Sequence, residues 1–451
     1  MKKNILAVCL TISLLTPLFT RGQSPSFIAK TDSLLNYLYM NDRFCGSVLF
    51  SIKGEVIYNK NFPANGIISG TAYKIGSITK MFTAVIIYQL IEEKKLLLTD
   101  KLNKFYPQVE NANLISIQQM LGHQSGIEDL INNDDFSEFR TNEMSKAEVV
   151  NLIAGYKSVF KPGKTTKYSN SNYILLGYII EDITKQSFSI VLKDRITDPL
   201  KLGETLLETS DNNIETLKGF TFNGKEWVEA NSETNVTISS AAGAMVSNPE
   251  DIGKFITALF NEELINKTYL DTMCKLTNST FGHGIFLTPF GKHIGYGHTG
   301  HIDEFRSAAS YFSNDSICFV ICINGLNYSM NDIALGVFSY YFNEDYKFPE
   351  VAKIDLADDV LKKYEGVYRL KLFHLIPITK VLIKSENGVL VTATAKNFEE
   401  EKTIAEPIAT DIFKNFQYRS TLIFKYKNNG KIKGCVLEQG KSELYCKRLK
   451  T

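Results

Sequence analysis

One stretch of the sequence, from Ser77 to about Lys95, predicts a helix that is apolar on almost every side over its first four turns. Its apolar residues are Ile78, Met81, Phe82, Val85, Ile86, Ile87, Leu90 and Ile91. A helix that lacks a polar face is stable only when other elements surround it. The chain must therefore fold around this helix, which excludes a disordered or fibrous protein.

Segments on both sides of the buried helix have the pattern of a sheet. Alternating or continuous apolar runs predict strands at 47–52, 55–59, 294–296, 307–312 and 317–323. Helical spacing is found at 27–39, over much of the chain up to about residue 270, and at 331–343. This order predicts an α+β domain over residues 24–345, with an antiparallel sheet built from both ends of the segment and a helical lobe inserted between them.

The pattern changes after Phe348-Pro349-Glu350. Short alternating segments run to residue 449, and they are separated by turn signals at Asn387-Gly388, Asn429-Gly430 and Gln439-Gly440. About eight strands fit this stretch, which is the number for a small closed barrel or a sandwich. We expect a second, all-β domain at 351–451, and this domain could itself be a ligand-binding part.

The first residues have the features of a signal peptide. Lys2 and Lys3 precede an apolar run from Ile5 to Phe19, and small residues flank Arg21. We expect residues 1–22 to be removed and the protein to be exported, to the periplasm or beyond the cell. No later stretch is as long and uncharged, so no integral membrane segment is expected after the signal peptide is removed.

Charge and cysteine content exclude several classes of partner. Lysine and arginine number 50 against 49 acidic residues, so no charge excess is available to bind nucleic acid or an anionic membrane, and charge alone names no partner. The chain has no Cys-x-x-Cys pair, and a metal cluster is not implied. A two-residue turn at Gly440-Lys441 would place Cys435 opposite Cys446, either as a disulfide or as two buried thiols.

Ser77 and Lys80 begin the buried helix, and a spacing of three places their side chains on one face. A lysine amine has a pKa of about 10.4 in water, but burial and positive neighbours can lower this pKa by several units. The helix N-terminus favours negative charge that develops on Ser77. The pair therefore has the chemistry of an activated nucleophile, although a single Ser-x-x-Lys is also common as a helix cap beside a solvated lysine.

Other motifs accompany this pair in order along the chain. They are Lys74-Ile75-Gly76, Leu121-Gly122-His123-Gln124-Ser125-Gly126, Tyr168-Ser169-Asn170, Ala242-Gly243-Ala244-Met245 and Gly297-His298-Thr299-Gly300-His301. With them the sequence resembles the serine β-lactamase and penicillin-binding-protein superfamily, most closely its class C-like branch of DD-peptidases, esterases and D-amino-acid amidases. The resemblance covers about residues 44–342. It implies a DD-peptidase/transpeptidase-like fold that needs no cofactor, and the C-terminal domain resembles lipocalin-like domains of some family members.

The resemblance implies a role for each motif. Ser77 would be the acylated nucleophile and Lys80 its proton partner. Tyr168, its phenol pKa lowered by neighbouring cations, would pass protons to the leaving group. Asn170 would donate to a substrate amide and hold Lys80, although Tyr-Ser-Asn is also a good polar loop. The backbone N–H groups of Ser77 and His301 would form an oxyanion hole, and each such donor is worth about 2.7 to 4 kcal/mol in the transition state.

The third motif departs from the β-lactamase pattern. His298 stands where those enzymes carry the lysine of Lys-Thr-Gly, which helps to bind a substrate carboxylate, and Thr299 and Gly300 complete the motif. A histidine is mostly neutral above pH 7, so it attracts a carboxylate much less than lysine does. Arg306 is the nearest fixed cation in sequence and could substitute. Ester substrates are therefore favoured over penicillins.

These observations predict an exported serine hydrolase that is acylated at Ser77 and then hydrolyses an ester or amide. The candidate acyl donors are D-alanyl peptides, D-amino acid derivatives and small esters. His123 is interpreted as a structural residue of its loop, and no histidine has ligand spacing for a metal. The alternative is a non-catalytic sensor or assembly protein that retains a penicillin-binding pocket.

Overall fold

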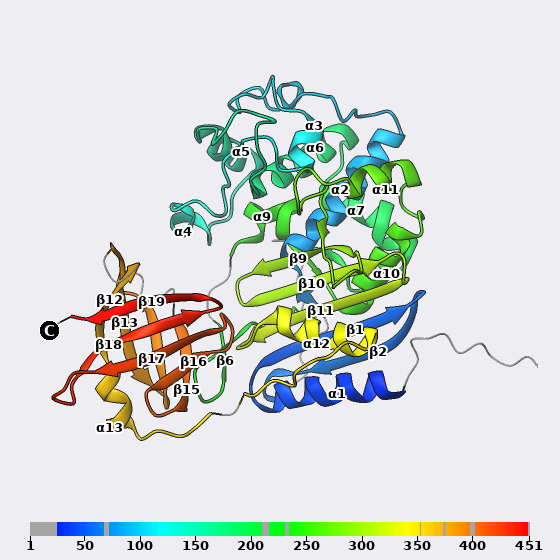
Figure 1. Ribbon diagram of the computed structural model, residues 1–451. Helices are drawn as coiled ribbons and strands as arrows, with labels where there is room; N and C mark the ends of the chain where they lie inside the picture. Colours follow the sequence, from blue (N-terminus) through cyan, green and yellow to red (C-terminus); the bar gives the residue numbers. More distant parts are fainter. Residues whose placement is uncertain are drawn as a thin grey trace, which may run out of the picture.

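The computed structural model describes residues 25–66, 72–209, 216–230, 234–351, 353–372, 376–396 and 402–449 (Figure 1). The predicted signal peptide, residues 1–22, lies outside these described residues. In the part of the chain that the structure describes, no helix has the length and apolar character needed to cross a membrane.

An antiparallel sheet forms the centre of the first domain, with the strand order β2-β1-β11-β10-β9-β8. These strands are β1 (Phe44–Ile52), β2 (Glu55–Phe62), β8 (Phe286–Leu287), β9 (Tyr296–Ile302), β10 (Phe305–Phe312) and β11 (Ile317–Leu326). A short hairpin of β5 (Phe220–Phe222) and β6 (Trp227–Glu229) extends it. Because β1 pairs with β11, the sheet joins the two ends of the segment, which confirms the predicted α+β topology.

The two faces of the sheet bury different helices, as the period-2 alternation of a strand requires. On β11, Phe319 and Ile321 pack in a cluster with α1 (Pro25–Met40) and α12 (Met330–Phe342), and these two helices contact each other. Val320 belongs to the opposite face and packs in the cluster that includes α2 (Thr79–Glu92) and α10 (Pro249–Phe260). Both faces are therefore covered, and the sheet is a central layer.

The helical lobe is inserted between β3 and β8 and surrounds α2. Its other α-helices are α3 (Ile117–Leu121), α4 (Phe136–Phe139), α5 (Lys146–Gly155), α6 (Asn170–Thr184), α7 (Phe188–Leu192), α8 (Asp198–Leu200), α9 (Val236–Gly243) and α11 (Lys267–Cys274). A small sheet of β3 (Tyr73–Lys74), β7 (Met245–Ser247) and β4 (Leu206–Leu207) lies beside them. All of α2 except Gln89 and Glu92 is buried, as predicted. The predicted helix start at Ser77 is instead a 3₁₀ turn over Gly76–Ile78.

The C-terminal domain is a closed eight-stranded antiparallel barrel, preceded by the short helix α13 (Asp358–Leu361). Its strands are β12 (Gly366–Leu372), β13 (Ile376–Glu386), β14 (Val389–Thr394), β15 (Thr403–Ala409), β16 (Ile412–Asn415), β17 (Ser420–Tyr426), β18 (Ile432–Gln439) and β19 (Ser442–Arg448). The last strand pairs with the first, so of the two predicted forms the barrel is the one adopted. Cys435 lies opposite Cys446 as the turn at Gly440-Lys441 predicts, and the two thiols are not bonded.

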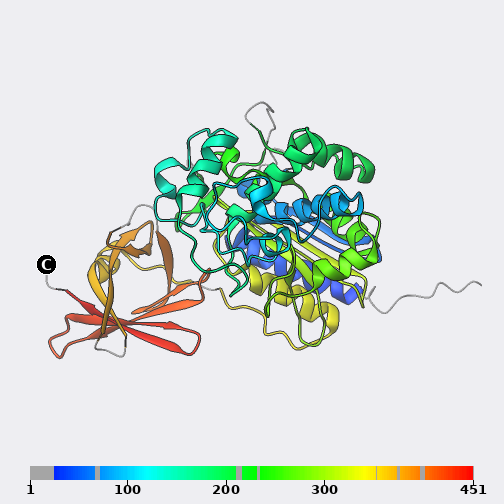
Figure 2. The same cartoon turned by 90° about the horizontal axis from the view of Figure 1, so that it is seen from above.

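A buried ion pair joins the barrel to the first domain, and the two domains lie side by side in both views (Figures 1 and 2). Arg43, immediately before β1, pairs with Glu406 on β15, and their side chains are 1% and 2% exposed. Asn327 Nδ2 donates to Glu406 Oε1 at 2.9 Å, and the Arg43 guanidinium lies 4.0 Å from the centre of the Phe416 ring. A second ion pair links Arg419 to Asp332. These contacts fix the barrel against the sheet.

Candidate active site

Ser77 lies in the 3₁₀ turn that precedes α2, and Lys80 lies in the first turn of α2. Lys80 Nζ is 2.9 Å from Ser77 Oγ, 2.8 Å from Asn170 Oδ1 and 2.6 Å from the carbonyl oxygen of Ala242. All three partners are uncharged acceptors. The predicted pair is therefore formed, and a buried polar shell holds the amine against the hydroxyl.

Burial changes the acid–base chemistry of Lys80. The side chain is 0% exposed, and this loss of solvation lowers the pKa of the amine to about 7. The negative charge of Asp129 acts in the opposite direction and raises it. An amine with this pKa is neutral in a large fraction of molecules at pH 7 to 8, so Lys80 can accept a proton.

Tyr168 also contacts Ser77, and its hydroxyl donates to Ser77 Oγ at 2.9 Å. The predicted lowering of its phenol pKa is wrong: burial raises the pKa, while the hydrogen bond with Ser77 lowers it by less. The negative charge of Asp129 also raises the pKa of this phenol. Tyr168 is therefore a proton donor that stays neutral at ordinary pH.

His123 holds the tyrosine ring in place. Its imidazole stacks on the Tyr168 ring with 4.4 Å between centroids, and the backbone N–H of Ser169 donates to its Nδ1. Burial lowers the pKa of His123 well below 6.5, so the ring is neutral. This agrees with the structural role predicted for His123.

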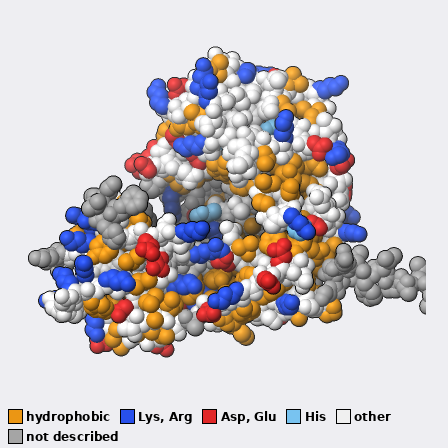
Figure 3. All heavy atoms as spheres, viewed as in Figure 1, with side chains coloured by type: hydrophobic (Ala, Val, Ile, Leu, Met, Phe, Trp, Pro, Cys, Tyr) orange, Lys and Arg blue, Asp and Glu red, His pale blue; other side chains and the backbone are white. Residues whose placement is uncertain are grey.

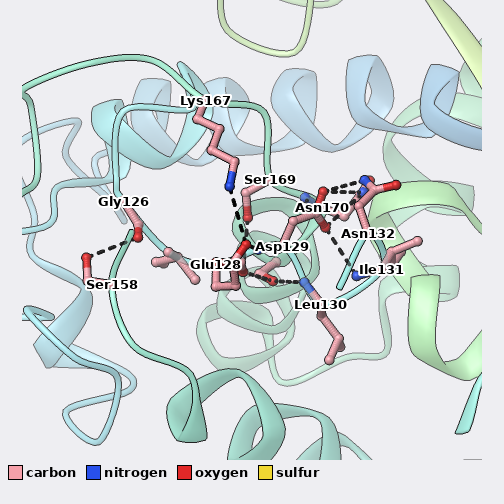
Figure 4. A network of polar contacts seen from close by, with 12 residues as sticks. Gly126, Glu128, Asp129, Leu130, Ile131, Asn132, Ser158, Lys167, Ser169 and Asn170 are labelled. Atoms are coloured by element: carbon pink, nitrogen blue, oxygen red, sulfur yellow. Dashed lines mark hydrogen bonds and ion pairs between the residues drawn. The ribbon is translucent and has the colours of Figure 1, made fainter. Parts of the chain in front are cut away.

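Asn170 and Asp129 form the next layer (Figure 4). Asn170 Oδ1 accepts from Lys80, which confirms that this amide holds the lysine. Asn170 Nδ2 donates to the two carboxylate oxygens of Asp129 at 3.0 and 3.1 Å, so donation to a substrate would compete with this contact. Asp129 is 4% exposed and also accepts from Asn132 and from the backbone N–H of Ile131.

Sequence reasoning missed Asp129, because nothing in its neighbourhood marks a functional carboxylate. Its role depends on two interactions with distant segments. The backbone N–H of Asn170, at the start of α6, donates to its carboxylate, and its negative charge raises the pKa of Lys80. The one available signal was an acidic residue within a few positions of the Leu-Gly-His-Gln-Ser-Gly motif.

The backbone around Ser77 lies against β9. Gly76 has a φ of +52°, and a Cβ on this residue would lie 2.7 Å from the backbone nitrogen of His301. A Cβ on Gly300 would lie 1.9 Å from the carbonyl oxygen of Ile75, so both positions require glycine. This close approach brings the peptide that carries Ser77 next to that of His301, which is the arrangement that an oxyanion hole needs.

The third motif forms β9, and its residues alternate between two sides of the strand. Thr299 and His301 are exposed, whereas His298 is 1% exposed and stacks on Phe286 with 3.9 Å between centroids. His298 Nδ1 lies 2.5 Å from the carbonyl oxygen of Thr299. Because that oxygen can only accept, Nδ1 carries the proton. Burial and the nearby Lys80 lower the pKa of His298 to about 3, so it is neutral as predicted, although its ring lies behind the cleft surface.

A cleft of about 1220 Å³ lies above these residues, and Figure 3 shows the surface hollowed between the helical lobe and the barrel. Ser77, Tyr168, Asn170 and His301 line it. Arg306, opposite His301 on β10, also lines it, and its guanidinium donates to the carbonyl oxygens of Asp303 and Phe305. Across the described ranges, no group of three or more His, Cys, Asp or Glu side chains is arranged to hold a metal ion.

A hydroxyl held between a neutral amine and a phenol, beside two adjacent backbone amides and under an open cleft, has the chemistry of acyl transfer. The fold and the cleft together define the chain as a serine hydrolase. In this type a lysine takes the place of the histidine that activates the serine in Ser-His hydrolases.

Comparisons with known proteins agree with this class. The model of the family described as Beta-lactamase matches residues 37–337, which is more than half of the chain, so the protein belongs to that family. The chain is 30% identical over 280 residues to Protein flp of Staphylococcus aureus strain MW2, a match that covers 58% of this chain and 55% of that protein. The chain thus spans about half the length of this curated relative.

Two further similarities extend the comparison. Teichoic acid D-alanine hydrolase of Staphylococcus aureus is 25% identical over 301 residues, covering 62% of this chain and 70% of that protein. The octameric penicillin-binding protein homologue from Pyrococcus abyssi matches the structure with a TM-score of 0.62 and 22% identity, over 93% of this chain and 99% of that one. At this identity the second match shows the fold alone, and its coverage includes both domains.

Proposed function

We propose that the protein hydrolyses an ester or amide by transferring the acyl group first to Ser77 and then to water. The observation that carries this proposal is the contact between Ser77 Oγ and Lys80 Nζ at 2.9 Å, with a lysine pKa of about 7. Such an amine takes the hydroxyl proton as the oxygen attacks, which a solvated lysine cannot do at neutral pH.

The geometry supports a complete acylation step. Ser77 Oγ attacks the carbonyl carbon and passes its proton to Lys80. The backbone N–H groups of Ser77 and His301 receive the negative oxygen. Tyr168, 2.9 Å from Ser77 Oγ, then relays a proton to the leaving group as the bond to the acyl carbon breaks. Water then attacks the acyl carbon bound to Ser77, and the proton transfers run in the reverse order. The carboxylic acid leaves and Ser77 regains its proton.

The acyl donor we propose is a D-alanyl peptide, another D-amino acid derivative or a small ester. Support comes from the relative named teichoic acid D-alanine hydrolase. A neutral, buried His298 supports donors that lack a free carboxylate next to the reacting bond. We also propose that residues 1–22 direct export, so that the hydrolase acts on the outer side of the cytoplasmic membrane in a bacterium.

Active-site labelling tests this proposal. The purified protein should react covalently with a fluorophosphonate and with a fluorescent penicillin, and the label should map to Ser77. A panel of matched D- and L-amino acid esters and amides should then show turnover. Labelling without turnover of any ester or amide would instead favour the sensor alternative, and labelling retained in Ser77→Ala would contradict the assignment of the nucleophile.

A further inference from the structure

The barrel forms one wall of the cleft that contains Ser77. Its contribution comes from β14, β15 and the turn after β16, and includes Val391, Thr403, Ile404, Gln417 and Tyr418. The ion pairs of Arg43 with Glu406 and of Arg419 with Asp332 hold this wall in position. A substrate that fills the cleft therefore contacts both domains.

A second cavity lies inside the barrel, with a volume of about 370 Å³. Most of its lining is apolar and includes Val381, Ile383, Ala405, Leu422 and Leu437. At about 30 Å³ for each water-sized group, it has space for a chain of roughly ten methylenes. An apolar cavity of this kind binds hydrocarbon better than water.

The cavity inside the barrel borders on the cleft. Thr403 and Tyr418 line both. The Tyr418 side chain is 52% exposed, while its backbone is fixed by Asn415, which accepts from its N–H, and by Gln439, which donates to its carbonyl oxygen. The core cluster of the barrel lines part of this cavity, but its three large aromatic residues Tyr364, Phe413 and Phe424 do not line it. The apolar cavity is thus found at the end of the barrel that meets the cleft.

Among the residues that the structure describes, the charges along the cleft wall are balanced. Three cations and three anions of this described part line it: Arg140, Arg306, Lys402, Asp303, Glu304 and Glu386. A balanced wall gives no advantage to a strongly charged ligand and suits a neutral, hydrogen-bonding one such as a sugar or a peptide.

We propose, building on the proposed hydrolase function, that the substrate is an amphiphile: an ester or amide at Ser77 that is joined by a neutral polar spacer to an alkyl chain held inside the barrel. The alkyl chain of the substrate takes no part in the chemistry. When the acyl carbon bonds to Ser77 Oγ, the bond to the amphiphile's oxygen or nitrogen breaks. The serine proton goes to that atom, and water later replaces Ser77 on the acyl group. The barrel supplies binding energy for this part of the substrate, which lowers KM more than it raises kcat.

A binding experiment tests the barrel site without requiring catalysis. Calorimetry on the full-length Ser77→Ala protein should show saturable binding of one n-decyl maltoside per chain, at concentrations below micelle formation. Hexyl maltoside should bind at least tenfold more weakly, because each buried methylene changes affinity by about threefold to fourfold. Absence of saturable binding, or equal affinity for both compounds, would overturn the proposal.

Substitutions in β15 give a matched control. Ala405 is 2% exposed and lines the cavity, whereas Ala409, on the same strand, lines neither the cavity nor the cleft. Ala405→Phe should abolish decyl maltoside binding and Ala409→Phe should leave it unchanged. If Ala405→Phe does not fold, Leu437→Trp blocks the same cavity from a partly exposed position. Unchanged binding in a folded cavity-blocking variant would contradict the proposed place of the chain.

Measurements of turnover then distinguish the proposed hydrolase function from the proposed role of the barrel in substrate binding. D-alanyl esters of decyl and hexyl maltoside should be hydrolysed by the wild-type protein with a KM at least tenfold lower for the decyl ester, and Leu437→Trp should remove this difference. Equal KM values with intact decyl maltoside binding would overturn the role of the barrel in substrate binding. Failure of the proposed hydrolase function has a different signature, because Ser77 would then not be labelled although the binding measured by calorimetry is retained.

Discussion

Two basic side chains are buried, Lys80 in the active site and Arg43 at the domain interface, and they differ in the groups that surround them. Neither is more than 1% exposed. Lys80 Nζ contacts the uncharged oxygens of Ser77, Asn170 and Ala242. The Arg43 guanidinium instead faces the carboxylate of Glu406 directly.

This difference distinguishes a basic group that can act in catalysis, Lys80, from one that holds two domains together, Arg43. Around Lys80, the carboxylate of Asp129 is separated from the amine by Asn170, so desolvation dominates and the lysine pKa falls to about 7. Around Arg43, the counter-ion Glu406 is in direct contact with the guanidinium. Burial without a direct counter-ion prepares a base, whereas burial with one fixes two domains together.

The largest expected effect is the loss of activity in Ser77→Ala. Covalent labelling should disappear, and kcat should fall by about 10⁴-fold or more, since the nucleophile acts as a unit with its base. The free energy of unfolding should change by no more than about 1 kcal/mol, because Ser77 is only half-buried and contributes little packing. Kinetics with an activated ester and thermal unfolding would check both. A large loss of stability would mean that the catalytic cluster also supports the fold.

Glu406→Gln should have the converse effect: it should lower the stability of the protein and leave its activity nearly unchanged. It leaves the Arg43 charge buried without a counter-ion, which typically costs about 3 to 5 kcal/mol. The kcat for a small ester should stay within about twofold, since no residue near Ser77 is altered. Urea unfolding compared with the double variant Arg43→Met/Glu406→Met checks the cause: the double variant should regain most of the stability. A double variant as unstable as Glu406→Gln would show that packing, and not the isolated charge, is responsible.

Lys80→Ala and Tyr168→Phe should each lower kcat by 10² or more, the usual scale for general acid–base catalysis. Tyr168→Phe is the sharper variant, because it removes the proton that is donated to Ser77 Oγ and keeps the ring that stacks on His123. Single-turnover acylation rates would measure the effect. Rates near those of the wild-type protein in both variants would mean that another base operates.

The smallest expected effect is a shift in pH dependence. Lys80 must be neutral to accept a proton, so kcat/KM should rise with pH and level off above the lysine pKa of about 7. His298, with a pKa of about 3, should contribute no step between pH 5 and 8. Asp129→Asn removes a charge that raises the pKa of Lys80, so the rise should move to lower pH. A shift to higher pH would show that the rise belongs to another group.

Much of the fold follows from patterns that are local in sequence. The helix around Phe82, the strands on the two sides of Lys53-Gly54 and the barrel turns at Asn387-Gly388 and Gly440-Lys441 are each set by neighbouring residues, and each is found where the sequence predicts it. Lys53 and Gly54 both have positive φ, as a tight two-residue hairpin turn requires.

The properties that sequence reasoning missed depend on what surrounds a residue. Period-2 alternation shows that His298 and Gly300 share one side of β9, but the choice of buried side depends on Phe286 and on the turn at Gly76. The sequence-based prediction for the phenol pKa of Tyr168 has the wrong direction, because desolvation by the fold raises this pKa by more than the hydrogen bond with Ser77 lowers it. Asp129 gains its influence on Lys80 only when distant segments meet.

The pairing of β1 with β11 has a consequence for the order of folding. Phe44 lies opposite Leu326, so the first strand of the chain cannot complete the sheet until the last strand of the domain has been synthesised. Contacts this distant along the chain carry a large loop-closure entropy and slow the search for the native state. The helical lobe lies between these two strands in the sequence, so all of it is synthesised before β11 is available. Glu406 lies still further along the chain, so its contact with Arg43 cannot form until this part of the barrel has been synthesised.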